Sequence, residues 1–110
     1  MVALVTLQQV NTALRLDLEE TGSPPYFTDE RMADVEMKIA QSQAAILDYL
    51  KVEGGKWDAT SVPGTVTAAI ILGVRGLFDG DDELLAGLYD NDRKNPIVGL
   101  LQRLRDPAIA

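Results

Sequence analysis

The chain is 110 residues long, which is the usual size of a single domain. It contains no cysteine and no histidine, which excludes disulfide bonds, thiolate metal sites and the usual proton shuttle at neutral pH. Seventeen acidic residues against ten basic ones give a net charge of -7, which disfavours binding to nucleic-acid phosphates. Hydrophobic residues make up 46% of the chain and aromatic residues only 5%, so we expect one largely aliphatic core.

The first predicted element is a helix over residues 7–16. Thr6 and Gln9 stand three positions apart, as in a helix capping box, and apolar residues follow at helical spacing. Over residues 18–27, Gly22 and the Pro24-Pro25 pair exclude a regular helix, so we expect a loop. The opening residues lack a basic leader, and no apolar stretch is long enough to span a membrane. We therefore expect a soluble protein, intracellular when synthesised, with no membrane partner.

The longest predicted element is a helix over residues 28–52, about 36 Å long. Thr28 is a suitable N-cap, and the two acids after it suit the positive end of a helix dipole. Gly54-Gly55 is expected to end this helix. Its apolar stripe recurs at periods of three, four and seven at Met32, Val35, Ile39, Ile46, Leu47 and Leu50.

A third helix is predicted from Pro63 to about Phe78, with Ser61 as a candidate cap. Its β-branched residues leave a strand pair as the alternative, but the apolar run is too long for one strand and contains no turn signal. Three glycines in or near this helix require close packing, either inside the domain or between subunits. The sequence leaves both explanations open for Gly64, Gly73 and Gly76.

The last third of the chain begins with an acidic turn over residues 79–83, followed by a short helix at 84–88 and a polar loop at 90–94. Asn95-Pro96 then combines an N-cap with a first-turn proline, and a final helix runs on until Asp106-Pro107 stops it. The predicted fold is a mainly α single domain over 1–110, a small helical bundle of four to five helices around one long central helix.

The sequence offers three candidates for chemical function. In the acidic turn, carboxylates alternate with other residues as in the first positions of a calcium-binding EF-hand loop. Its sixth and twelfth positions are Leu84 and Asp90, where an EF-hand has Gly and Glu, so we reject calcium binding at this site. Lys38 and Ser42 lie one helical turn apart on a face that we expect to be exposed, a spacing that arises easily by chance. The acidic residues show no pair in an apolar setting of the kind that acid–base catalysis uses. We expect no enzymatic activity, no catalytic residue, no cofactor and no metal.

The only net-basic segment is the C-terminal one, which carries Arg93, Lys94, Arg103 and Arg105. Favourable charge at a helix C-terminus explains it, and so does a docking patch for an acidic partner. A DNA-binding helix-turn-helix would need a basic recognition helix, whereas residues 28–52 are net acidic.

Several stretches occur in a distinctive order along the chain. They are Ala13-Leu14-Arg15-Leu16-Asp17, the helix from Asp29 to Leu50, Val62-Pro63, Asn95-Pro96-Ile97-Val98-Gly99-Leu100-Leu101 and Arg103-Leu104-Arg105-Asp106-Pro107-Ala108-Ile109-Ala110. In this succession the chain resembles the head–tail connector family (head-completion or adaptor proteins) of long-tailed bacteriophages and prophages. The resemblance spans nearly the whole chain, and its closing stretch is the most specific part. The chain departs from the family in a longer loop at 19–27 and in ending its third helix with Gly76-Leu77-Phe78.

The resemblance implies a structural virion protein that assembles in the host cytoplasm and resides at the head–tail junction. About twelve copies would form a ring that binds the portal protein, meets the downstream neck, stopper or tail protein, and extends the DNA channel without sequence recognition. Residues 101–110 would form a docking tail for the portal. The portal-docking residues implied by position are Leu101, Arg103, Leu104, Arg105, Pro107 and Ile109.

A different class of function remains as the alternative: a small acidic helical regulatory or nucleic-acid-associated adaptor that works as a monomer or dimer. Salt-dependent binding to duplex DNA would favour this adaptor. Ring formation without DNA binding would favour the connector.

Overall fold

The computed structural model describes residues 3–18, 20–21, 26–27, 30–51 and 57–104. In this part of the chain the structure is mainly helical, which confirms the predicted small bundle built around one long helix. The elements are α1 (Leu7–Leu14), β1 (Glu20–Thr21), β2 (Tyr26–Phe27), α2 (Met32–Leu50), α3 (Gly64–Asp79), α4 (Asp82–Ala86), the 3-10 turn η1 (Gly87–Asp90), α5 (Pro96–Leu101) and the 3-10 turn η2 (Gln102–Leu104).

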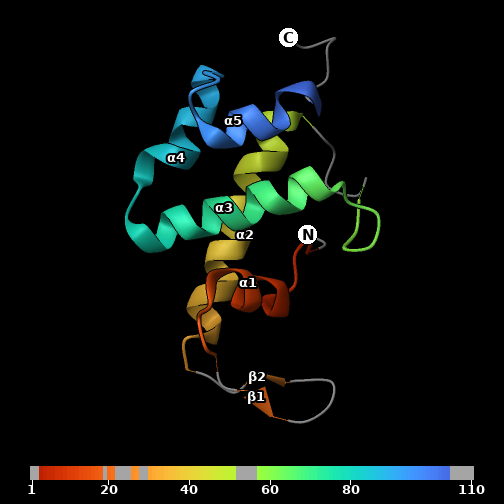
Figure 1. The fold of residues 1–110 in the computed structure, drawn as a ribbon, viewed down its shortest axis with the longest axis vertical. Helices are drawn as coiled ribbons and strands as arrows, with labels where there is room; N and C mark the ends of the chain where they lie inside the picture. The colour runs from red at the N-terminus through yellow and green to blue at the C-terminus, as the bar shows by residue number, and fades with distance from the viewer. Residues whose placement is uncertain (1–2, 19, 22–25, 28–29, 52–56, 105–110) are drawn as a thin grey trace.

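Helix α2 runs along the length of the molecule, and α3 crosses it near the middle (Figure 1). Helices α4 and α5 pack against α3 at one end, and α1 packs against α3 on the other side. The small β1–β2 ladder lies at the far end, where Glu20 pairs with Phe27 and Thr21 with Tyr26. The segment predicted as a loop therefore contains this short antiparallel pair.

The capping box at the start of α1 is confirmed. The Thr6 side chain accepts a hydrogen bond from the Gln9 amide, and the Gln9 side chain accepts one from the Thr6 amide. Helix α1 ends two residues earlier than predicted because Arg15 adopts the left-handed conformation, with φ 53°.

Helix α2 is shorter at both ends than the predicted span of 28–52. It begins after Arg31, so the prediction of Thr28 as N-cap is wrong; Thr28 itself lies outside the described residues. It ends at Leu50 because Lys51 turns into the left-handed region, ahead of Gly54-Gly55, which also lie outside the described part. Its 19 residues span about 28 Å.

The apolar run after Pro63 forms a helix, α3, and the strand alternative is excluded. The prediction that Ser61 caps this helix is wrong, because Ser61 Oγ instead accepts a hydrogen bond from the Asp58 amide at 2.9 Å. The Asp58 carboxylate in turn accepts bonds from the Thr60 hydroxyl and from the Thr60 and Ser61 amides. A local turn at 58–61 therefore leads into α3.

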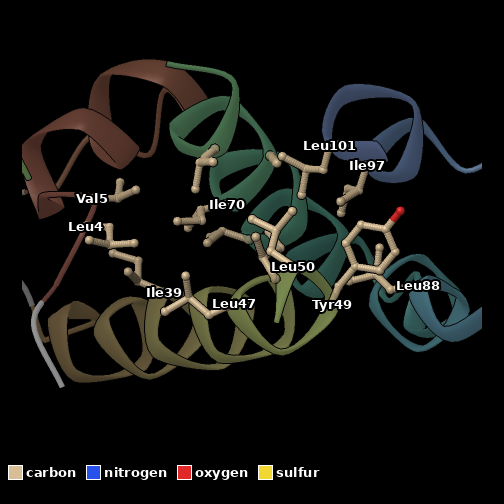
Figure 2. Packing of buried hydrophobic residues seen from close by; sticks show 14 of the residues in the cluster. Leu4, Val5, Ile39, Leu47, Tyr49, Leu50, Ile70, Leu88, Ile97 and Leu101 are labelled. Atoms are coloured by element: carbon tan, nitrogen blue, oxygen red, sulfur yellow. The ribbon is translucent and has the colours of Figure 1, made fainter. Parts of the chain in front are cut away.

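The core is aliphatic, as composition predicted, and Tyr49 is its one buried aromatic residue among those described. Figure 2 shows side chains of the N-terminal segment, α2, α3 and α5 converging on one cluster. Two polar side chains are buried with them: Ser42 donates to the Ile70 carbonyl at 2.8 Å, and Gln43 Oε1 accepts from the Leu4 amide at 2.8 Å.

Two of the three α3 glycines are explained by packing inside the molecule. A Cβ at Gly73 would lie 2.1 Å from Ser42 Oγ, and one at Gly76 would lie 2.7 Å from Leu84 Cδ2. The first contact joins α3 to α2 and the second joins it to α4. A Cβ at Gly64 would meet no atom within 4 Å, so close packing in the described structure does not explain this residue.

Candidate docking surface

The exposed face of the last helix carries an apolar and basic patch. Helix α5 turns Ile97, Val98 and Leu101 into the core, where all three are fully buried. Its opposite face and the η2 turn expose Leu100 and Leu104, each 39% accessible, with Arg103 between them in sequence. We call Leu100, Arg103 and Leu104 the C-terminal patch.

The six docking residues predicted from sequence fall into three groups. Leu101 is 0% exposed and points with Ile97 into the core near Leu50, so its assignment to a docking surface is corrected (Figure 2). Arg103 and Leu104 are exposed. The predicted contacts at Arg105, Pro107 and Ile109 lie outside the described residues.

The C-terminal patch belongs to a basic stretch, because residues 93–104 include Arg93, Lys94 and Arg103 and no acidic residue. Arg93 Nε donates to Gln102 Oε1 at 2.8 Å, which ties this arginine to the η2 turn. The charged ends of Lys94 and Arg103 make no hydrogen bond or ion pair with the rest of the described chain. Positive charge on this surface is therefore not neutralised within the described structure.

A hollow of opposite charge lies beside α4 and η1. It has a volume of about 450 Å³, and we call it the acidic hollow. Three carboxylates line it together with two small residues and one amide, and no basic side chain contributes to its wall. The lining residues are Glu83, Ala86, Gly87, Asp90, Asp92 and Asn95.

One residue connects the two surfaces. Asn95 caps α5 by accepting a hydrogen bond from the Ile97 amide at 2.9 Å, as predicted. Its side-chain amide also donates to the Leu84 carbonyl of α4 at 2.8 Å. The acidic hollow and the C-terminal patch are therefore carried by elements that share this bridging side chain.

The Lys38–Ser42 pair is separated by the fold. Ser42 is fully buried against α3, so the expectation that this face is exposed is wrong at Ser42. Its hydroxyl donates to the Ile70 carbonyl, whereas Lys38 Nζ lies 2.6 Å from Asp34 and 4.8 Å from the centre of the Phe78 ring. These side chains have structural partners, and the arrangement does not activate a nucleophile. The described residues also contain no group of three carboxylates placed to hold a metal ion.

Tyr89, which no sequence pattern indicated, is 79% exposed on η1. Its hydroxyl donates to Asp48 Oδ2 at 3.2 Å, and this hydrogen bond and the charge of Asp48 raise the pKa of Tyr89 above its usual range. Nearby, the hydroxyl of Tyr49 donates to Asn91 Oδ1. Helical spacing alone places residues on faces of one helix and gave no signal for these contacts, because both join α2 to residues some 40 positions later in the chain.

Within the ranges that the structure describes, no helix is long and apolar enough to cross a membrane. Comparison of the chain with protein-family models, with curated proteins and with solved structures finds no match.

Proposed function

We propose that this protein is a structural subunit of the bacteriophage head–tail junction, where copies form a ring between the portal and the neck or tail. The observation that carries the proposal is the C-terminal patch. It consists of Leu100 on α5 and of Arg103 and Leu104 on η2, with no described partner for the arginine, and the inner face of α5 lies in the core. A rigid surface that combines apolar area with arginine is typical of protein–protein contacts.

The acidic character of the chain suits this role. A net charge of -7 disfavours tight contact with phosphates, so DNA can pass through a channel lined by such subunits without adhering. An enzymatic role has less support, because the fold gives Lys38 and Ser42 separate structural partners.

We assign portal docking to the tail that follows Leu104, which includes Arg105, Pro107 and Ile109. In this proposal Arg105 supplies charge and Ile109 supplies the apolar anchor. The tail follows directly on η2, so α5 connects it to the core. A downstream neck, stopper or tail protein would bind the opposite rim of the ring.

The test is the native mass of the concentrated protein, alone and mixed with the portal protein encoded with it. We expect a closed species of about twelve subunits in at least one sample, and co-migration with the portal. A chain ending at Leu104 should keep its helical circular dichroism and unfolding midpoint but lose portal binding. The cut is placed after Leu104 because Gln102 bonds Arg93, so an earlier cut would disturb the described fold.

A monomer in both samples would contradict the connector and favour the regulatory or nucleic-acid-associated adaptor. The observation in favour of that second function is the positive charge of Lys94 and Arg103, which no ion pair with a described residue neutralises. Its test is a gel shift with duplex DNA over a series of salt concentrations. Binding that weakens steeply with salt and is lost in Arg103→Glu would support the adaptor.

A further inference from the structure

We propose that the C-terminal patch of one copy packs against the acidic hollow of a second copy, head to tail. This inference deepens the proposed function and rests on it, because it names the contact between neighbouring subunits of the ring. It separates that contact from portal docking, which is assigned to the tail after Leu104.

Charge complementarity is the first argument. The patch presents Arg103 and no acidic residue, and the described wall of the hollow presents three carboxylates and no basic side chain. Arg93 and Lys94 lie next to the hollow in sequence but do not line it. Asp92 Oδ1 accepts a hydrogen bond from the backbone amide of Lys94, but this neutral donor leaves the negative charge of the hollow in place. Each surface therefore carries a charge that the other can neutralise.

Position is the second argument. Figure 1 shows α4 and the C-terminal turn on opposite sides of the same end of the molecule. Two different surfaces that face different ways form a heterologous contact, and repeating such a contact produces a ring or a filament. Closure into a ring requires a fixed angle between the two surfaces. Two features supply that constraint: Asn95 bonds both Leu84 of α4 and Ile97 of α5, and both helices pack against α3.

The chemistry of the two surfaces favours a second copy over DNA as the occupant. Leu100 and Leu104 are apolar and would gain little from a phosphate backbone, whereas Ala86 and Gly87 offer small neighbours beside the carboxylates. A surface that mixes leucine with arginine matches a hollow that mixes small apolar residues with acids.

Cysteine cross-linking tests the contact, because the natural chain has no cysteine. Ala86→Cys and Leu104→Cys are made as separate proteins and mixed at low salt under mild oxidation. Thr12→Cys, exposed on α1, is the matched control partner for Leu104→Cys. We expect the 86–104 heterodimer to form on the order of tenfold faster than the 12–104 heterodimer, and this advantage to shrink as salt is raised.

A charge swap distinguishes the proposed contact from random collision, because random collision would not make the cross-linking rate depend on these charges. Arg103→Glu in the Leu104→Cys protein should remove the advantage, and Glu83→Arg in the Ala86→Cys protein should restore it. Equal rates for 86–104 and 12–104, or no response to the swap, would overturn the proposal. Suppression of the 86–104 product by duplex DNA that binds through Arg103 would also overturn it and assign the patch to nucleic acid.

The two proposals fail in different ways. A chain that cross-links as expected but never binds a portal contradicts the proposed function and leaves the contact between copies standing. A chain that binds the portal through its tail but shows no 86–104 preference contradicts only the contact.

Discussion

At the scale of single residues, the contact between Gly73 and Ser42 decides how closely α2 and α3 approach. Ser42 is fully buried, and its hydroxyl bonds the Ile70 carbonyl one turn before Gly73. The glycine leaves room for this hydroxyl, since a Cβ would come within 2.1 Å of it. A buried serine and a facing glycine therefore act as a matched pair.

We expect Gly73→Ala to lower the free energy of unfolding by about 1–3 kcal/mol, because the added methyl group overpacks the interface. Gly64→Ala is the control, since its Cβ meets no atom within 4 Å and should leave stability unchanged or slightly higher. Urea unfolding followed by circular dichroism measures both. Adding Ser42→Ala to Gly73→Ala should recover part of the loss, and simple additivity would contradict the pairing.

We expect the stability of the fold to depend on pH through Asp58. Hydrogen bonds from the Thr60 side chain and backbone and from Ser61 lower the pKa of this carboxyl in the folded chain. A group with a lowered folded pKa stabilises the fold above its unfolded pKa, and this contribution disappears as the pH falls through the folded value. An NMR titration should find the pKa of Asp58 below its usual range and nearer to it in Thr60→Ala. An ordinary pKa in the natural chain would contradict this prediction.

At the scale of elements, the side chain of Asn95 bridges α4 and α5, which both also pack against α3. Asn95 satisfies a free amide at the start of α5 and also donates to the last turn of α4. A short helix of six residues has little stability of its own, so it depends on this cap and on core contacts. This side chain, together with the packing of both helices against α3, holds the acidic hollow and the C-terminal patch in one orientation.

We expect Asn95→Ala to cost about 1–2 kcal/mol of unfolding free energy, since it removes the cap and the bond to α4. Asn95→Ser is the matched control, because its hydroxyl can accept from the Ile97 amide, while its shorter side chain gives up the bond to the Leu84 carbonyl and adds no charge to the acidic hollow. Its loss should be smaller than that of alanine. Thermal unfolding of the three proteins measures the series, and an alanine variant as stable as the natural chain would exclude the capping role.

At the scale of the whole molecule, the core joins the C-terminal helix to the centre of the bundle. Leu101 packs with Ile97 against the cluster around Leu50 (Figure 2). Leu104, one turn later, is 39% exposed. Leu101 therefore supports the C-terminal patch through the fold, and Leu104 belongs to the patch itself.

We therefore expect alanine to lower stability at Leu101 and to weaken association between copies at Leu104. Leu101→Ala should lower the free energy of unfolding by about 2–5 kcal/mol, because it leaves a cavity in a filled core. Leu104→Ala should change stability by less than about 0.5 kcal/mol but weaken association between copies. Urea unfolding followed by circular dichroism and by Trp57 fluorescence checks the first effect, since Trp57 packs against the same core. Similar stability losses in both variants would contradict the division.

Local patterns in the sequence predicted the elements that depend on near neighbours. The Thr6–Gln9 box and the Asn95 cap join residues two or three positions apart, so their chemistry is present in the sequence itself. The helix ends were predicted less well. Arg15 and Lys51 end their helices in the left-handed conformation, which residue type does not favour at either position.

The sequence by itself determined the mainly helical class, the aliphatic core, the order of the helices and the charge contrast between the acidic and basic segments of the last third. These follow from periodicity and composition, which act locally along the chain. Tertiary structure alone decided that Ser42 is buried and that Leu101 belongs to the core while Leu104 does not. Leu100, Leu101 and Leu104 all fit a helical pattern, and only the packing of α5 against α3 selects which of them lose contact with water.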